Sequence, residues 1–253
     1  MKTDLFVSVR RWDTGQLEEL ALSGRVQGII LGDPFCPQRM FEHGSWELPV
    51  LVQAAKVAGL RVAYQTPVYL TPRNYSENLD LILSLEQRGS LDFLLVQDVG
   101  LLNSLSESEC RIPICWSLWG VSRGDTLSRD LLDFLLQLGV RYLETDKPTR
   151  VGPLQEYGIK VVYRQHAPKV ATFGRVCYTQ YVLGSSCNNR SLCIQKEPAL
   201  AATEGRLSLK VSGYTLQHTH PLRNPCPEAV PDYVTVYLSK AAELPGVLAD
   251  ERD

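Results

Sequence analysis

The chain has 253 residues, of which 44% are hydrophobic and 21% are charged, and its formal net charge is −2. This is an ordinary globular composition, and the charge lacks the basic excess of a dedicated nucleic-acid binder. No apolar run approaches the roughly 20 residues of a membrane helix, and the first residues are charged where a signal peptide is apolar. We therefore expect a cytoplasmic protein with a large core, whose seven cysteines are not needed as disulfides.

Short β-rich runs alternate with amphipathic stretches through the first two thirds of the chain. In chain order we predict a strand at 4–10, a helix at 15–22, a strand at 26–31, a helix at 48–58, a strand at 61–70, a helix at 74–87, strands at 91–96 and 112–118, a helix at 126–138, and strands at 140–144 and 159–164. Strands that alternate with helices are typical of parallel βαβ units. Seven strands are too many for a small doubly wound sheet, so the pattern predicts an α/β fold, a TIM-like (β/α) barrel that need not be complete or regular.

The pattern changes after residue 164. Residues 165–200 contain three of the cysteines and little periodicity, and late strands are predicted at 207–216 and 232–239. Residues 240–253 have the composition of a frayed tail. We expect a single barrel-type domain over residues 1–253, made of regular β/α units at 1–164, a cysteine-rich metal-binding segment at 165–200, and closing strands with a tail at 201–253.

Four cysteines follow predicted strands in positions that can bring them together. Cys36 comes directly after the second strand, and Cys177, Cys187 and Cys193 come after the seventh. Loops that follow parallel strands meet at one end of a barrel, so a distant cysteine can join three local ones. Four thiolates are the usual ligands of a 4Fe-4S cluster and of structural zinc, and spacing alone leaves the metal open. Unrelated packing thiols are the alternative, which three cysteines within one loop-like segment disfavour.

The other three cysteines have weaker claims on a metal. Cys110 and Cys115 flank a proline at the start of the fifth strand, and we interpret Cys115 as a core residue and Cys110 as a surface or packing residue. Cys226 lies between two prolines. It is either a fifth candidate ligand or, as we interpret it, a loop thiol.

Two segments of the chain resemble peptidase family U-32, the collagenase-like peptidases. GRVCYTQYVLGSSCNNRSLC, preceded by APKV, is similar to the signature region of that family, and VQGIILGDPFCPQR is similar to its second-strand segment. LDFLLVQDVGLLNSL resembles the family's apolar strand, D-x-G step and leucine-rich helix start. The likeness is closest to the UbiV type, which also has a cysteine after strand two.

The resemblance implies a barrel-like fold and a 4Fe-4S cluster on Cys36, Cys177, Cys187 and Cys193. It also implies a homologous UbiU-like partner subunit and support of oxygen-independent hydroxylation in ubiquinone synthesis. Other relatives hydroxylate RNA bases, and prephenate is the proposed hydroxyl source in part of the family. The alternatives are a non-catalytic, metal-stabilised scaffold for a catalytic homologue, and a protease, for which no nucleophile–base motif is present.

This chain departs from the family pattern in several places. Phe173 replaces the motif serine, and Val170 stands where the UbiU-type branch has a cysteine. The loop between Cys177 and Cys187 is shorter than in the UbiV type, the loop from Cys187 to Cys193 is longer, and the whole chain is short for the family. These differences leave the cluster in place as an expectation, and a divergent branch with another substrate is an alternative to the ubiquinone role.

Charged and polar side chains near the predicted rim are further candidates for a small-molecule site. Three arginines suit bidentate carboxylate contacts or ordinary salt bridges: Arg39, Arg164 and Arg175. Asp98 ends the fourth strand, and it is either a catalytic acid or a residue that stabilises the turn.

The histidines have two interpretations each. His166 follows the seventh strand and either donates to a substrate or caps that strand. His218 and His220 share one strand face. They are either two metal ligands or part of a polar strand surface.

Overall fold

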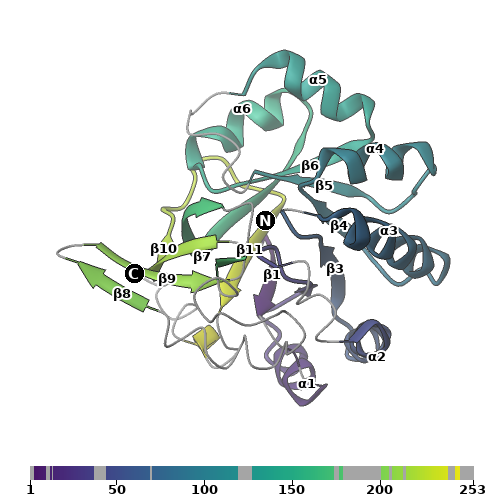
Figure 1. The fold of residues 1–253 in the computed structure, drawn as a ribbon, viewed down its shortest axis with the longest axis horizontal. Coiled ribbons are helices and arrows are strands. Elements are labelled where there is room, and N and C mark those ends of the chain that lie inside the picture. Colours follow the sequence, from purple (N-terminus) through teal and green to yellow (C-terminus); the bar gives the residue numbers. More distant parts are fainter. Residues whose placement is uncertain are drawn as a thin grey trace.

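A computed structural model describes residues 3–9, 12, 14–36, 44–68, 70–118, 127–173, 177–178, 201–204, 207–212, 215–238 and 243–245. Eight parallel strands close into a barrel in the order β11-β1-β2-β3-β4-β5-β6-β7, with β11 also paired to β7 (Figure 1). The barrel strands are β1 (Asp4–Val9), β2 (Gly28–Leu31), β3 (Arg61–Gln65), β4 (Phe93–Val96), β5 (Ile114–Ser117), β6 (Val140–Thr145), β7 (Lys160–Phe173) and β11 (Tyr233–Leu238). The predicted TIM-like barrel is therefore confirmed, and it is closed.

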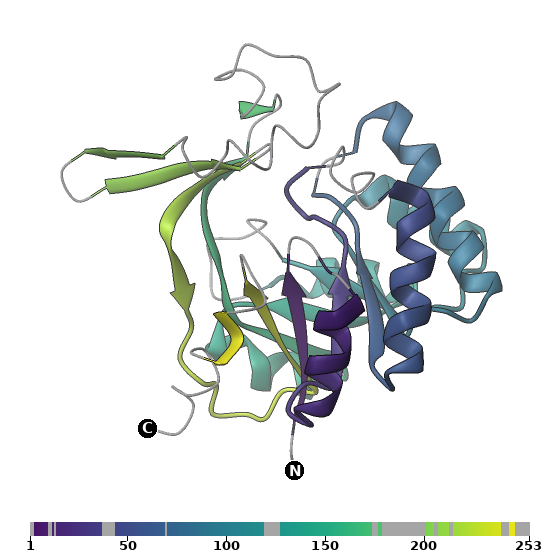
Figure 2. The same ribbon diagram turned by 90° about the horizontal axis from the view of Figure 1, so that it is seen from below.

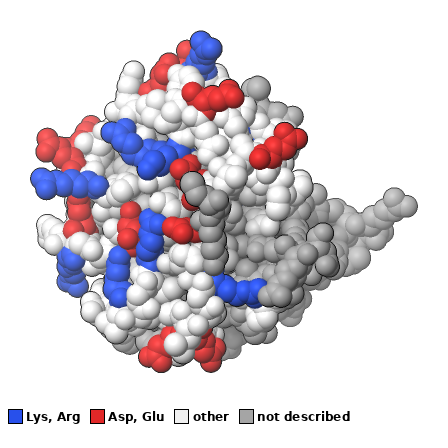
Figure 3. All heavy atoms as spheres, turned by 180° about the vertical axis from the view of Figure 1, so that it is seen from behind, with Lys and Arg blue, Asp and Glu red and all other residues white. Residues whose placement is uncertain are grey.

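Helices connect the strands and cover the outside of the barrel (Figure 1). They are α1 (Thr14–Leu22), α2 (Gly44–Val57), α3 (Pro72–Gln87), α4 (Val99–Glu107), α5 (Arg129–Gln137), the 3₁₀ turn η2 (Pro148–Arg150) and α6 (Val151–Glu156). None of the described helices is long and apolar enough to cross a membrane. On the face shown in Figure 3, acidic and basic side chains are interspersed.

The predicted order of elements lacks α4 and α6. α4 buries Leu101, Leu102 and Leu105, but a glycine and two serines in its nine residues lower its helix propensity. α6 has only six residues and includes Gly152 and Pro153. Both helices depend on packing against the barrel more than on local propensity, which a sequence pattern reports poorly.

β7 is longer than predicted and belongs to two parts of the sheet. Its first residues pair in parallel with β6 and β11, and the stretch from His166 to Phe173 pairs antiparallel with β10 (Thr215–Arg223). β9 (Leu207–Ser212) and β8 (Ala201–Glu204) complete this extension, which we call the projecting sheet. The strand predicted at 159–164 therefore continues to Phe173, and the predicted strand at 207–216 is divided between β9 and β10.

The projecting sheet extends beyond the barrel. In Figure 2 β7 and β10 continue past the tip of β1, and β8 and β9 point away to one side. A regular TIM barrel has a helix between its last two strands. Here the chain leaves β7 and returns through β10 before it forms the closing strand β11.

Aromatic side chains fill the amino end of the barrel. The ring centroid of Phe93 is 4.9 Å from that of Phe6 and 5.8 Å from that of Tyr233, and Tyr142 lies 5.6 Å from Tyr233. The guanidinium of Arg61 lies over the Tyr233 ring at 4.9 Å. We call these five residues the floor cluster, because they close the barrel end opposite to the loops that follow the strands.

Gly28 leaves the space that Phe6 occupies. A Cβ atom at this position would lie 2.3 Å from a carbon of the Phe6 ring, and that ring is held by its aromatic neighbours. We expect Gly28→Ala to lower the free energy of unfolding by about 1–3 kcal/mol, the usual range for overpacking. Urea denaturation followed by circular dichroism measures the change.

Gly152→Ala provides the control for this prediction. The added methyl would meet only Ala229 at an ordinary 3.7 Å, in the helix α6 where alanine is favoured. The control variant should be neutral or more stable by up to ~1 kcal/mol. Equal destabilisation of the two variants would contradict the packing argument.

Candidate functional site

The carboxyl half of the barrel interior is polar, in contrast to the floor cluster. A buried carboxylate, Glu144 on β6, lies at its centre and contacts side chains from three other strands. Its partners come from β5, β7 and β11, and they are Ser117, Arg164, Thr235 and Tyr237. We call Glu144 and these four residues the carboxylate network.

Strand alternation places the carboxylate network inside the barrel. On β6, Leu143 packs in the core beneath the helices, while Tyr142 packs against a second buried cluster inside the barrel. We call this second cluster the interior cluster, and it consists of Phe6, Ile30, Phe35, Ala63, Phe93, Leu95, Cys115, Val162, Ala167 and Tyr237. Because successive side chains point to opposite faces, Glu144 shares the inner face with Tyr142. The same alternation on β5 sets Ser117 on the face of Cys115.

Every oxygen of Glu144 is occupied. Oε2 accepts from the hydroxyl of Ser117 and lies 3.1 Å from the guanidinium of Arg164. Oε1 accepts from Thr235 at 3.0 Å and from the phenol of Tyr237 at 2.8 Å. A carboxylate with this set of donors is fixed in position, so Glu144 orients the four side chains around it.

Burial keeps the neighbours of Glu144 protonated. The pKa of the Tyr237 phenol is raised well above its ordinary value, first by burial and then by the charge of Glu144. The pKa of the Cys115 thiol is raised for the same two reasons. Tyr237 is therefore a hydrogen-bond donor in this site, and Cys115 is an unreactive interior thiol.

The loop after β2 carries Cys36 and folds back over the end of β3. Gly32 has a positive φ of 104°, and a Cβ atom there would lie 2.1 Å from the carbonyl oxygen of Gln65. The backbone carbonyl of Pro34 accepts from the amide of Val68, beyond β3, and Phe35 packs into the interior cluster. Cys36, next in the chain, is 4% exposed. A glycine is required because the two backbones are in direct contact.

The structure describes two of the four predicted metal ligands. Cys36 and Cys177 are both buried, neither is in a disulfide, and Cys177 lies four residues beyond the end of β7. Cys187 and Cys193 lie outside the described residues. Within the described part of the chain, no three or more of His, Cys, Asp and Glu gather as a metal site. The four-cysteine site stays a prediction.

The remaining cysteines lie where their interpretations place them. Cys115 is fully buried in the barrel and Cys110 is partly buried. Cys226 is exposed, and its sulfur is 3.9 Å from the amide nitrogen of Gln165, whose neighbour Arg164 faces the interior. Because strand side chains alternate, this contact sets Cys226 outside the barrel wall.

The other candidate side chains have structural partners where the structure describes them. Arg164 is 2% exposed and pairs with Glu144 and with Asp146, the latter at 3.5 Å. Asp98 caps α4 by accepting from the amide of Leu101, as a turn residue would. The ring of His166 contacts the backbone carbonyl of Tyr237 at 3.1 Å. Outside the described residues or side chains lie Arg39, Arg175, His218 and His220.

Sequence reasoning missed most of the carboxylate network. Ser117, Thr235 and Tyr237 occur inside short strands that the pattern marks only as buried. The one available signal is a charged residue at the end of a buried strand, as with Glu144 in VRYLET. A buried charge implies a partner, although the sequence does not say which one.

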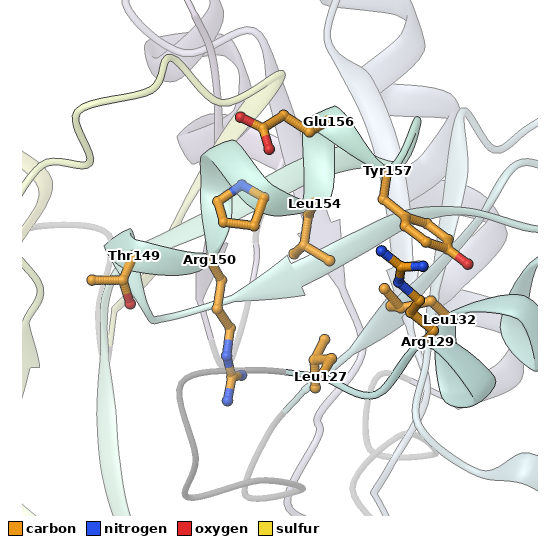
Figure 4. Close-up of a pocket in the computed structure, with 9 residues that line it drawn as sticks. Leu127, Arg129, Leu132, Thr149, Arg150, Leu154, Glu156 and Tyr157 are labelled. Atoms are coloured by element: carbon orange, nitrogen blue, oxygen red, sulfur yellow. The ribbon is translucent and has the colours of Figure 1, made fainter.

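A pocket of about 690 Å³ lies on the outside of the barrel between α5 and α6 (Figure 4). Leucines 127, 132 and 154 line it together with Arg129 and Tyr157. None of the cysteines that the structure describes and no member of the carboxylate network contributes to it. It is therefore separate from the candidate site.

The comparisons with known proteins support the fold and nothing more specific. No protein-family model matches the chain, and no curated protein matches it. Tryptophan synthase from M. tuberculosis, in an open form with BRD0059 bound, has a TM-score of 0.52 at 12% identity, over 97% of this chain and 86% of that chain.

A second similar structure is a truncated 3-deoxy-D-arabino-heptulosonate 7-phosphate synthase from Thermotoga maritima. Its TM-score is 0.44 at 14% identity, and the match covers 64% of each chain. This chain thus spans less than two thirds of that synthase's length. At sequence identities this low, a structural match shows the fold alone and says nothing of activity.

The buried ion pair of Glu144 and Arg164 is testable by a double-mutant cycle. Glu144→Gln and Arg164→Met each leave a buried charge without its main partner, so each should lower the free energy of unfolding by about 3–5 kcal/mol. The double variant removes both charges and should cost clearly less than the sum. Urea unfolding of the four proteins measures the coupling, and strict additivity would contradict it.

The raised pKa of Cys115 predicts a loss of stability at alkaline pH. The unfolded thiol loses its proton above its ordinary pKa of 9.0, whereas the folded thiol keeps it. The unfolded state then binds fewer protons, so stability falls as pH rises through this window. Relative to Cys115→Ala, the unmodified protein should lose about 1 kcal/mol more between pH 7 and pH 10. Urea unfolding across this range measures it, and a constant difference would refute the assignment.

Proposed function

We propose that this chain is an iron–sulfur protein that holds a 4Fe-4S cluster on Cys36, Cys177, Cys187 and Cys193 at the carboxyl end of the barrel. In this proposal it supports oxygen-independent hydroxylation of a ubiquinone-type or RNA-base substrate, as one subunit beside a homologous UbiU-like partner. The supporting observation is that Cys36 and Cys177 are both buried thiols in segments that follow barrel strands.

The described ligands fit a cluster in their chemistry. Cluster irons are bound by thiolates, and a cluster buried from solvent is tuned by the groups around it. The backbone before Cys36 is fixed, because the side chain of Asp33 accepts from the amide of Phe35 at 2.7 Å. This fixed loop presents Cys36 without a large ordering cost, which favours metal binding.

The residues of this chain would give the site its shape. The cluster, when bound, supplies electron transfer or a place for substrate to bind. The carboxylate network holds Arg164 and Tyr237 at the inner wall, and the floor cluster closes the opposite end.

Anaerobic purification followed by a visible spectrum and by iron, sulfide and zinc analysis tests the proposal. We expect broad visible absorbance and about four irons and four sulfides per chain. Cys36→Ser and Cys177→Ser should each lose most of the iron. Cys226→Ser and Cys110→Ser provide matched controls, since these thiols are outside the proposed ligand set, and both should keep it.

Two outcomes would contradict the cluster. Stoichiometric zinc without iron would make the site a structural one and favour the scaffold alternative. Protein without either metal would overturn the proposal and leave a barrel with buried thiols. Loss of iron in the Cys226→Ser control would show that the ligand set is wrong.

A further inference from the structure

The side-chain amides of two buried glutamines at the carboxyl ends of β3 and β4 make no hydrogen bonds to the described part of the chain. In Gln65 and in Gln97 both the amide nitrogen and the amide oxygen are buried without a partner. The two side chains are 0% and 7% exposed. Buried amides are normally hydrogen-bonded, because an unsatisfied group costs more than an average bond contributes. Two unsatisfied side-chain amides in one region therefore indicate a hydrogen-bond partner that the described residues do not supply.

Strand pairing sets both amides on the inner wall of the barrel. β3 and β4 are parallel neighbours, and Gln65 lies opposite Leu95. Gln97 is two residues beyond Leu95, so alternation returns its side chain to the same face. That face is the interior one, because Ala63 and Leu95 belong to the interior cluster.

The amide pair lies at the end of the barrel where ligands bind. Sites in this fold are built at the carboxyl ends of the strands. The loop that carries Phe35 and Cys36 crosses the end of β3 in backbone contact with Gln65. Gln65 is thus enclosed by the barrel wall and by this loop, and Gln97 is buried on the neighbouring strand end.

The surrounding charges favour an uncharged ligand. Among the described residues, the cation that faces the carboxyl half of the interior is Arg164, and it is engaged by Glu144 and Asp146. An anion would meet a neutralised guanidinium and two carboxylates. Each glutamine instead offers N–H donors beside a carbonyl acceptor.

We propose that Gln65 and Gln97 form a binding subsite for an uncharged polar ligand that carries a hydrogen-bond donor directly beside an acceptor, such as a carboxamide or a lactam. The subsite is an inference independent of the cluster, because neither glutamine is in the proposed ligand set. The ligand completes the hydrogen bonds that the protein leaves open, so the cost of burying the amides is recovered on binding.

Titration of the full-length protein with 2-pyrrolidone tests the subsite. The side-chain NH₂ resonances of the two glutamines are assigned by their loss in Gln65→Met and Gln97→Met. We expect both resonances to shift saturably, with roughly millimolar affinity, as befits so small a probe. Cyclopentanecarboxylate, similar in size but anionic, should leave them unmoved. A response to the carboxylate alone, or to neither probe, would overturn the proposal.

The thermal stability of the same variants is a second measurement. An apolar side chain of similar shape relieves the unsatisfied amide, so each Met variant should melt ~2–4 °C higher. Gln27→Met is the matched control and should melt lower, because the Gln27 carbonyl accepts from the amide of Leu5 at 2.9 Å. A lower melting temperature of both subsite variants would show that the two amides stabilise the fold, and it would contradict the proposal. Their iron content separates this result from a failure of the cluster.

Discussion

The structure depends on one buried carboxylate. Glu144 links β5, β6, β7 and β11 from inside the barrel. Its bonds to Thr235 and Tyr237 matter most, because they attach the closing strand to strands that lie far earlier in the chain. In a low-dielectric interior these hydrogen bonds are strong, and the loss of any one of them leaves a charge exposed to apolar surroundings.

This constraint explains how the barrel tolerates an unusual connection. Between β7 and β11 the described residues form the projecting sheet, at the place where a regular TIM barrel has a crossover helix. The entropic cost of a longer connection grows slowly with its length, and contacts at the closing strand act against this cost. Arg164 on β7 and Tyr237 on β11 meet at the same carboxylate, and the two strands also pair directly.

Much of the fold could be predicted from the sequence, because buried parallel strands and amphipathic helices have distinct periods. The helix α4 and the outer half of β7 could not, since Gly100 and the two serines of α4 are weak helix formers and β7 mixes polar and apolar residues in two environments. Cysteines could be chosen as candidate ligands from the sequence, because cysteine is a rare residue and three of the seven lie close together in the chain. The roles of Glu144, Gln65 and Gln97 were not, because a polar residue at a strand end reveals neither its partner nor its lack of one.

The floor cluster has a consequence for the direction from which the interior side chains can be reached. Stacked rings and the guanidinium of Arg61 fill the amino end. A group that binds to the interior side chains would therefore approach from the carboxyl end, between the loops that follow the strands. Substitutions in those loops would change such a site, whereas substitutions in the floor cluster would act on stability.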